Sequence, residues 1–107
     1  MKRIVVRKRG ELHALRPEEV IFMEKELRKI TAHTVHGKIE FYGTFSKLIP
    51  SLDNRFMCCH RSFIINMDKI NVMAGNSIFL VDGPRILFGR ATYERAKKVF
   101  SAYLNMV

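Results

Sequence analysis

The sequence predicts a mostly antiparallel β domain with two or three short helices, and three observations support that prediction. Turn signals recur roughly every eight to twelve residues along the chain. The apolar runs between them are only about four residues long and rich in aromatic and branched side chains, which suits buried strands better than helices. A length of 107 residues with 48% hydrophobic content is enough for a real core. We therefore expect one domain over residues 1–107.

The N-terminal part begins with a basic segment, residues 2–9, whose β-branched centre predicts an arm or an edge strand. Pro17, followed by two glutamates, predicts the first turn of a short helix, because proline and acidic side chains favour that position. About the first 19 residues would thus form a basic strand and a short helix. The apolar run 20–23 predicts a buried strand, and the mixed-charge residues 24–29 predict a turn.

Residues 30–35 and 38–42 predict a β-hairpin around the turn signal at 36–37, because the second run alternates clearly between apolar and polar side chains. Thr44 then stands where a helix N-cap is expected. The apolar residues that follow have helical spacing, so we expect a short helix there.

The stretch RFMCCHRSFIINMDKI, residues 55–70, organises the rest of the chain. It places the polar triplet His60, Arg61 and Ser62 between two short apolar runs that predict buried strands. The triplet would lie at a strand end or in a tight connection, where packed flanks would hold it ready to meet a partner. Asn66 is expected to bond backbone groups in the turn after the second strand.

The C-terminal part predicts three more strands and a helix. Strand-like runs occupy residues 70–73, 77–81 and 85–88, with a hairpin turn between the last two. A helix is expected from Tyr93 to about residue 104, with an apolar stripe along one face and Thr92 as its N-cap.

The net charge of +9 and the pI near 10.0 indicate a polyanionic partner, nucleic acid first and an anionic membrane surface second. No apolar run approaches the ~20 residues needed to cross a bilayer, and the basic N-terminus is not followed by a signal-peptide core. We therefore expect a soluble cytoplasmic protein that does not insert into membranes.

Enzyme chemistry has little support in the sequence. The four histidines fall at no familiar metal-ligand spacing, and the adjacent Cys58 and Cys59 lack the separation of a zinc knuckle, so no metal and no cofactor are expected. No glycine-rich phosphate loop and no Ser-His-acid order stands out. A thiol redox sensor, with His60 and Arg61 helping to form a thiolate, is kept as an alternative, although cysteine in a small core site is the commoner case.

Cations in turns are the more informative candidates. Arg28, Lys29, Arg61 and Arg90 all fall at expected strand ends or turns, from which they could reach phosphates or guanine edges. A second interpretation is a basic adaptor that binds RNA or an anionic membrane through residues 2–9 and the C-terminal helix.

Residues 41–70, FYGTFSKLIPSLDNRFMCCHRSFIINMDKI, resemble the core signature of the LytTR DNA-binding domain, the output domain of many bacterial response regulators in two-component systems. The matching features, in order, are a short helix ending in a Leu-Asp turn, an Arg-Phe strand start, His-Arg-Ser-Phe, an apolar pair, Asn, and an Asp-Lys-Ile close. The likeness extends more weakly from about residue 20 to the hairpin at 82–83.

This resemblance implies small stacked antiparallel sheets whose loops enter successive major grooves of double-stranded DNA. It implies a first contact at Arg28 or Lys29, with the register left open, and a central contact at His60 and Arg61. The third falls at Arg90, although this chain has Gly-Arg-Ala-Thr at 89–92 where the family commonly has serine and paired arginines.

The resemblance also implies partners. Transcriptional response regulators carry a receiver domain, for which this chain has no room, so we expect either a C-terminal piece or a stand-alone variant. Binding of two protomers to direct repeats is the family expectation.

Overall fold

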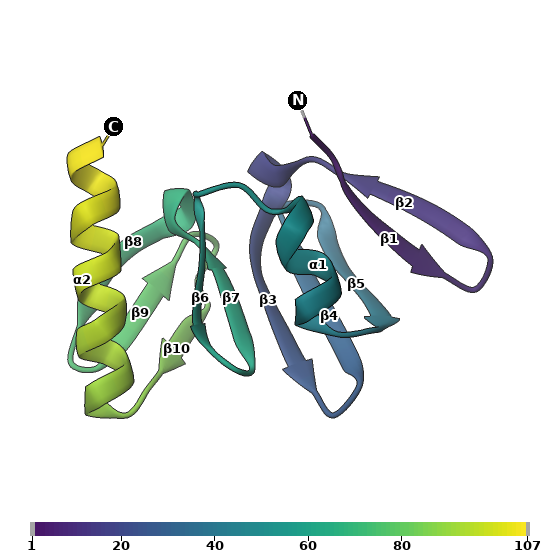
Figure 1. The fold of residues 1–107 in the computed structure, drawn as a ribbon. Helices are drawn as coiled ribbons and strands as arrows, with labels where there is room; N and C mark the ends of the chain where they lie inside the picture. The colour runs from purple at the N-terminus through teal and green to yellow at the C-terminus, as the bar shows by residue number, and fades with distance from the viewer. Residues whose placement is uncertain (1, 107) are drawn as a thin grey trace.

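The computed structural model describes residues 2–106 and contains, within them, three antiparallel sheets and two α-helices (Figure 1). The elements are β1 (Ile4–Lys8), β2 (Glu11–Leu15), the 3₁₀ helix η1 (Pro17–Glu19), β3 (Val20–Glu26), β4 (Lys29–Thr34), β5 (Gly37–Tyr42), α1 (Phe45–Leu48), η2 (Ile49–Ser51), β6 (Phe56–His60), β7 (Phe63–Asn66), η3 (Met67–Lys69), β8 (Ile70–Ala74), β9 (Ser77–Leu80), β10 (Arg85–Leu87) and α2 (Arg90–Met106). The sheets are β1-β2, β5-β4-β3-β7-β6 and β10-β9-β8.

Two hydrophobic cores lie on opposite faces of the central strands. Along β3, Met23 belongs to the first core and Phe22 to the second, and Ile64 and Ile65 divide in the same way along β7. The first core is completed by β1 and α1, and the second by the three-stranded sheet and α2. Burial on both faces explains why these strands appear in the sequence as continuous apolar runs, and it confirms their prediction as buried strands.

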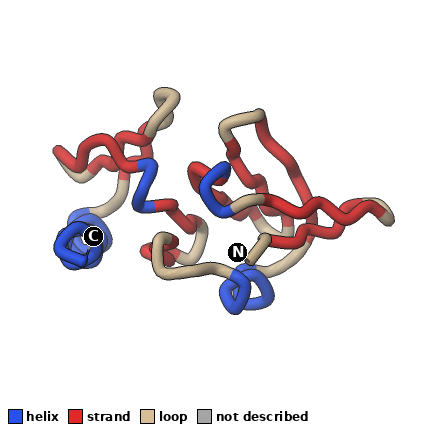
Figure 2. The backbone as a smooth tube through the Cα atoms, turned by 90° about the horizontal axis from the view of Figure 1, so that it is seen from above, coloured by secondary structure: helices blue, strands red, loops and turns tan. Residues whose placement is uncertain are grey.

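The N-terminal hairpin projects sideways from the rest of the molecule (Figure 2). β1 confirms the predicted basic strand, and η1 confirms the short helical turn at Pro17. β2 is a strand that no pattern in the sequence predicts. Its residue Leu12 is 63% exposed and the strand contributes no fully buried side chain, so apolar alternation is missing.

The turn predicted at residues 24–29 is wrong over most of its length. β3 continues through it, and β4 follows after only two residues, Leu27 and Arg28. The charged side chains fit here because one side of this part of the sheet faces solvent. On the other side, the Lys25 ammonium lies 5.4 Å from the centre of the Phe45 ring, so its aliphatic stem can remain in the fold.

Two polar residues make the local bonds that the sequence predicts. The Thr44 hydroxyl caps α1 by accepting from the backbone N–H three residues later at 3.4 Å. Asn66 accepts from the backbone N–H of Asp68 at 2.9 Å. Its buried amide also donates to the carbonyl oxygens of Pro17 and Val20, which ties β7 to the start of β3.

The predicted hairpins appear as β4–β5 and β9–β10. The last helix begins earlier than predicted, at Arg90, so the assignment of Thr92 as its N-cap is wrong. The Tyr93 N–H donates to the Gly89 carbonyl oxygen at 3.0 Å, which makes Gly89 the first acceptor of the helix. Thr92 therefore lies inside the first turn. No helix among the described residues is long and apolar enough to cross a membrane.

Candidate nucleic-acid interface

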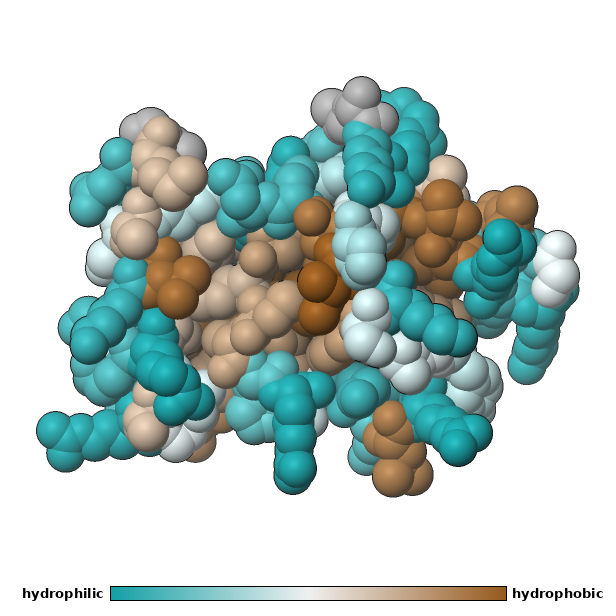
Figure 3. Space-filling model, viewed as in Figure 1, coloured by the Kyte–Doolittle hydropathy of each residue, from teal (hydrophilic) through white to brown (hydrophobic). Residues whose placement is uncertain are grey.

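Three connections that are far apart in the sequence reach the same edge of the molecule, the lower edge in Figure 1. They are the β3–β4 turn, the β6–β7 turn and the passage from β10 into α2. Each carries one exposed arginine: Arg28, Arg61 and Arg90. Hydrophilic side chains project along this edge in the space-filling view (Figure 3).

The β6–β7 turn holds Arg61 at its tip. The backbone N–H of Ser62 donates to Nδ1 of His60 at 3.0 Å, so a neutral His60 carries its proton on Nε2. The carbonyl oxygen of Ser62 accepts from the backbone N–H of Lys25 at 2.9 Å, which ties the turn to β3. His60 thus makes a bond within the fold, and its second ring nitrogen is the one suited to donate to a ligand.

An aromatic cluster supports the second and third connections together. The His60 ring lies 5.7 Å from Phe63 and 5.9 Å from Phe88, and these two phenylalanines meet edge to face at 5.6 Å. The backbone N–H of Phe88 also donates to the carbonyl oxygen of Asn76 at 2.9 Å. Phe88 stands two residues before Arg90, so one packed base positions both the β6–β7 turn and the start of α2.

The β3–β4 turn separates the two residues proposed for the first contact. Arg28 is exposed in the turn, and its carbonyl oxygen accepts from the N–H of Gly43 at 3.0 Å. Lys29 is the first residue of β4, and its ammonium lies 3.8 Å from a carboxylate oxygen of Glu40 on the neighbouring strand. Arg28 is therefore presented at the edge, whereas Lys29 lies on the face of the sheet.

The three edge arginines differ electrostatically from a structural arginine elsewhere. Within residues 2–106, no carboxylate forms an ion pair with Arg28, Arg61 or Arg90. Arg55 instead lies 2.9 Å from Asp53, and this hydrogen bond and the nearby carboxylates raise the pKa of the Arg55 guanidinium above its usual value. The first turn of α2 also contains no acidic residue, so its positive dipole end and Arg90 act together.

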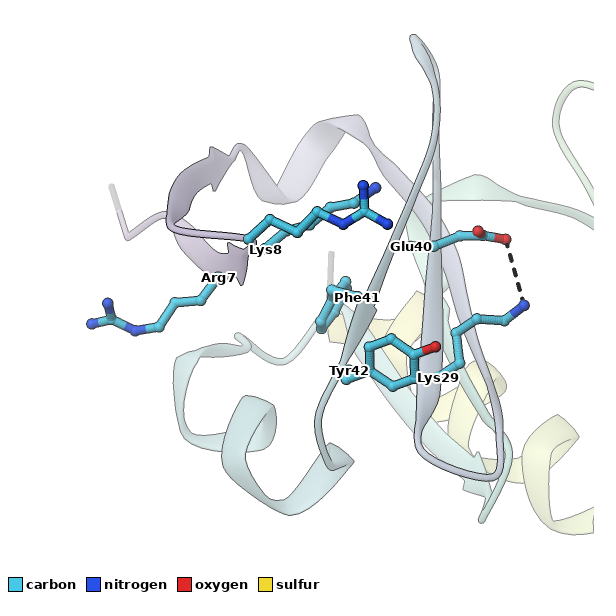
Figure 4. Close-up of a pocket in the computed structure, with 7 residues that line it drawn as sticks. Arg7, Lys8, Lys29, Glu40, Phe41 and Tyr42 are labelled. Atoms are coloured by element: carbon cyan, nitrogen blue, oxygen red, sulfur yellow. Dashed lines mark ion pairs between the residues drawn. The ribbon is translucent and has the colours of Figure 1, made fainter.

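A basic hollow of about 310 Å³ lies beside the β3–β4 turn, between the N-terminal hairpin and β5 (Figure 4). Its lining residues are Arg7, Lys8, Arg9, Lys29, Glu40, Phe41 and Tyr42. In Figure 4 the side chain of Lys8 extends toward the sheet, whereas that of Arg7 points away from it. Tyr42 belongs to this site because it pairs with Lys29 in the β4–β5 register, a relationship that follows only once the hairpin register is known.

Comparison with known proteins identifies the fold and the family. The family model of the LytTr DNA-binding domain matches residues 10–101. This chain belongs to the LytTR family. A solved structure described as a LytTr DNA-binding domain from Bacillus cereus superposes with a TM-score of 0.75 over 92% of this chain and 96% of that one, at 15% sequence identity. The predicted family resemblance and the mostly β fold of small antiparallel sheets are confirmed.

Curated relatives of this LytTR domain are regulators by name. Transcriptional regulatory protein NatR of Bacillus subtilis is 33% identical over 69 residues, which is 64% of this chain and 30% of that protein. Accessory gene regulator protein A of Staphylococcus aureus is 36% identical over 55 residues, 50% of this chain and 23% of that protein. The chain therefore spans less than a third of the length of these relatives.

The LytTR match contains all three edge arginines but begins after β1. The hollow beside the β3–β4 turn is thus lined partly by residues inside the match and partly by Arg7, Lys8 and Arg9, which precede it.

The two cysteines of this LytTR domain lie on β6. Cys58 is exposed, whereas Cys59 is partly buried against the second core. Burial raises the pKa of the Cys59 thiol to about 11 and raises that of Cys58 as well. Both thiols are therefore protonated at neutral pH, which does not favour the redox alternative. Among the described residues, no group of three or more His, Cys, Asp or Glu side chains is placed to hold a metal ion.

Proposed function

We propose that this LytTR domain binds duplex DNA in a sequence-specific manner through the edge formed by the three connections. The observation that carries the proposal is that each connection presents an exposed arginine without a carboxylate partner among the described residues, namely Arg28, Arg61 and Arg90. A row of cations on turns, rather than on a helix face, is suited to enter a groove from several points at once.

The dimensions of the molecule support contacts in successive grooves. Its longest extent is 41 Å, and one turn of B-form DNA rises about 34–36 Å. This extent includes the N-terminal hairpin, which lies beyond the three connections (Figure 1), so the connections and the basic hairpin together could reach neighbouring grooves on one side of the duplex.

The geometry suggests a division of roles. Arg61 is exposed at a turn tip, from which its guanidinium can fork onto guanine O6 and N7 or onto a phosphate. Nε2 of His60 suits a phosphate oxygen, because Nδ1 is already used by Ser62. Arg90 at the start of α2 suits a phosphate as well, since the helix dipole adds to its charge. Lys29, paired with Glu40, would act from the side as a weaker phosphate contact.

The basic hollow beside the β3–β4 turn would extend this footprint. Lys8 and Arg9 stand on the N-terminal hairpin next to Lys29, with only one carboxylate, Glu40, in the lining. Such a site fits backbone phosphates that flank the specific sequence and carries no base information of its own.

In the cell, this domain would act as the output part of a cytoplasmic transcriptional regulator. The relatives are much longer than this chain, which leaves room in such proteins for a receiver domain. Two protomers on direct repeats would double the footprint and supply cooperativity.

A competition experiment tests the proposal. A duplex enriched from a random pool by the 107-residue chain is competed with random duplex, RNA and anionic vesicles at physiological salt. We expect the enriched duplex to outcompete the others by orders of magnitude. Equal competition by RNA or vesicles would instead favour the basic adaptor that uses the N-terminal hairpin and α2.

A further inference from the structure

Leu27 is an exposed apolar residue at a backbone position that favours other residue types. It is the first of the two residues in the β3–β4 turn and has a φ of +56°, which two-residue hairpin turns adopt and which favours glycine or asparagine. Its side chain is 91% exposed, so no packing energy offsets the cost of placing leucine in this backbone conformation. The hairpin explains the backbone conformation but not the presence of leucine, and this points to a function of the exposed side chain.

Leu27 is also part of a surface. An open hollow of about 610 Å³ lies at this turn and is lined by Glu26, Leu27, Arg28, Lys29 and Tyr42. Tyr42 is 78% exposed, and its strand register opposite Lys29 places it on the same face of the sheet. In the space-filling view, a hydrophobic group projects below the β3–β4 turn among hydrophilic ones (Figure 3). The apolar tip is therefore flanked by two cations, Arg28 and Lys29, and by one carboxylate, Glu26.

We propose that Leu27 determines specificity by packing against the 5-methyl group of a thymine in the major groove. The inference rests on the proposed function, because it needs the β3–β4 turn to face DNA. The methyl group of thymine is the apolar feature that the major groove displays, and apolar side chains contact it there. Arg28 and Lys29, which follow the tip directly, match the phosphates that border the groove.

The basic side chains near Leu27 favour DNA over an apolar protein surface as the partner of this turn. The basic hollow beside the β3–β4 turn, whose lining includes Arg7, Lys8 and Arg9, adjoins this open hollow, because Lys29 and Tyr42 line both. A protein surface that buried Leu27 would also have to neutralise these cations, whereas DNA supplies the methyl group and the phosphates together.

The test compares thymine with uracil in a selected duplex. The parent chain enriches a duplex from a random pool, and each thymine in it is then replaced in turn by deoxyuridine, which lacks only the methyl group. Leu27→Asn removes the apolar tip while suiting a left-handed backbone, so its thermal midpoint should equal or exceed that of the parent. Leu104→Asn is the matched control, since Leu104 is 52% exposed in the last turns of α2, the helix whose C-terminal end lies at the opposite edge of the molecule (Figure 1).

At one thymine, the parent and Leu104→Asn should lose about fourfold in affinity on replacement by deoxyuridine, the effect of one buried methyl group. Leu27→Asn should bind the thymine duplex more weakly and lose nothing further on replacement. If no replacement weakens the parent, or if Leu27→Asn keeps the parent's sensitivity, the inference is overturned while sequence-specific binding stands. Insensitivity of the parent to every replacement would be expected if Leu27 instead inserted between bases in the minor groove. If the parent enriches no duplex, the proposed function fails, and this inference fails with it.

Discussion

His60 and Ser62 are joined by a hydrogen bond that closes the β6–β7 turn around Arg61, with the Ser62 N–H donating to Nδ1 of His60 at 3.0 Å. The ring that accepts this bond is itself packed against both Phe63 and Phe88. Arg61 is thus presented by a rigid turn rather than by a mobile loop, which lowers the entropy lost when it binds a partner.

Arg61→Ala should reduce specific DNA binding by about 1–3 kcal/mol and leave the fold intact. The side chain is exposed and has no ion pair among the described residues, so its removal costs the fold little. A titration of the enriched duplex at matched salt measures the loss. Lys98→Ala removes the same charge from the exposed face of α2 and should have little effect. Parent-like affinity in the Arg61 variant would assign Arg61 to a role outside the interface.

Two substitutions of His60 separate a phosphate contact from a purely structural role. His60→Asn can still accept from the Ser62 N–H, since asparagine closes such turns, whereas His60→Phe keeps only the ring packing. Both lose the Nε2 donor. A phosphate contact predicts that both variants bind specific and random duplexes more weakly, by about 0.5–1.5 kcal/mol. Weaker binding by the phenylalanine variant alone would indicate that His60 only shapes the turn.

Neutralising the hairpin should change the salt dependence of binding rather than its sequence preference. In the variant Lys8→Gln/Arg9→Gln, the slope of log affinity against log salt should become shallower by about 0.9 for each phosphate that is no longer neutralised. The variant Lys97→Gln/Lys98→Gln makes the same change of charge on α2. Equal slopes in the two double variants would remove the hollow beside the β3–β4 turn from the interface.

The elements that the sequence predicts well are those whose side chains are buried on both faces. VIFM at residues 20–23 and FII at 63–65 are apolar throughout because Phe22 and Met23, and likewise Ile64 and Ile65, enter different cores. β2 has no such signal, since its apolar residue Leu12 remains exposed.

The candidate site was only partly predictable for a related reason. Arg61 stands inside the recognisable His-Arg-Ser-Phe motif, whereas Arg90 stands where the sequence departs from the family pattern, so its position is only suggested by sequence. The importance of Leu27 depends on a positive φ and on a two-residue turn, and neither can be inferred while residues 24–29 are taken as one long turn. The start of α2 was misplaced because Thr92 is a good N-cap residue, whereas the actual first acceptor is the carbonyl oxygen of Gly89, which any residue could supply.

The cysteines should react slowly and in a fixed order with iodoacetamide. The raised pKa of Cys59, about 11, means that its thiolate becomes abundant only as the pH rises toward that value, so its labelling should accelerate from pH 7 to pH 10. Exposed Cys58 should be labelled first. Mass spectrometry of the native chain measures the order, and the denatured chain, in which both thiols should react alike, is the control. Rapid labelling of Cys59 at pH 7 would revive the redox alternative.

Asn66→Asp tests the bond network that ties β7 to the start of β3. The Asn66 amide nitrogen lies 2.7 Å from the carbonyl oxygen of Val20 and 3.3 Å from that of Pro17, and its side chain is fully buried. Aspartate has the same shape but would bury a carboxylate against two carbonyl oxygens, so urea unfolding should show a loss of about 3 kcal/mol or more. The loss should shrink on acidification, because a protonated carboxyl can donate one bond. Asn71→Asp on exposed β8 is the control, and an equal effect in both variants would show that the network contributes no stability.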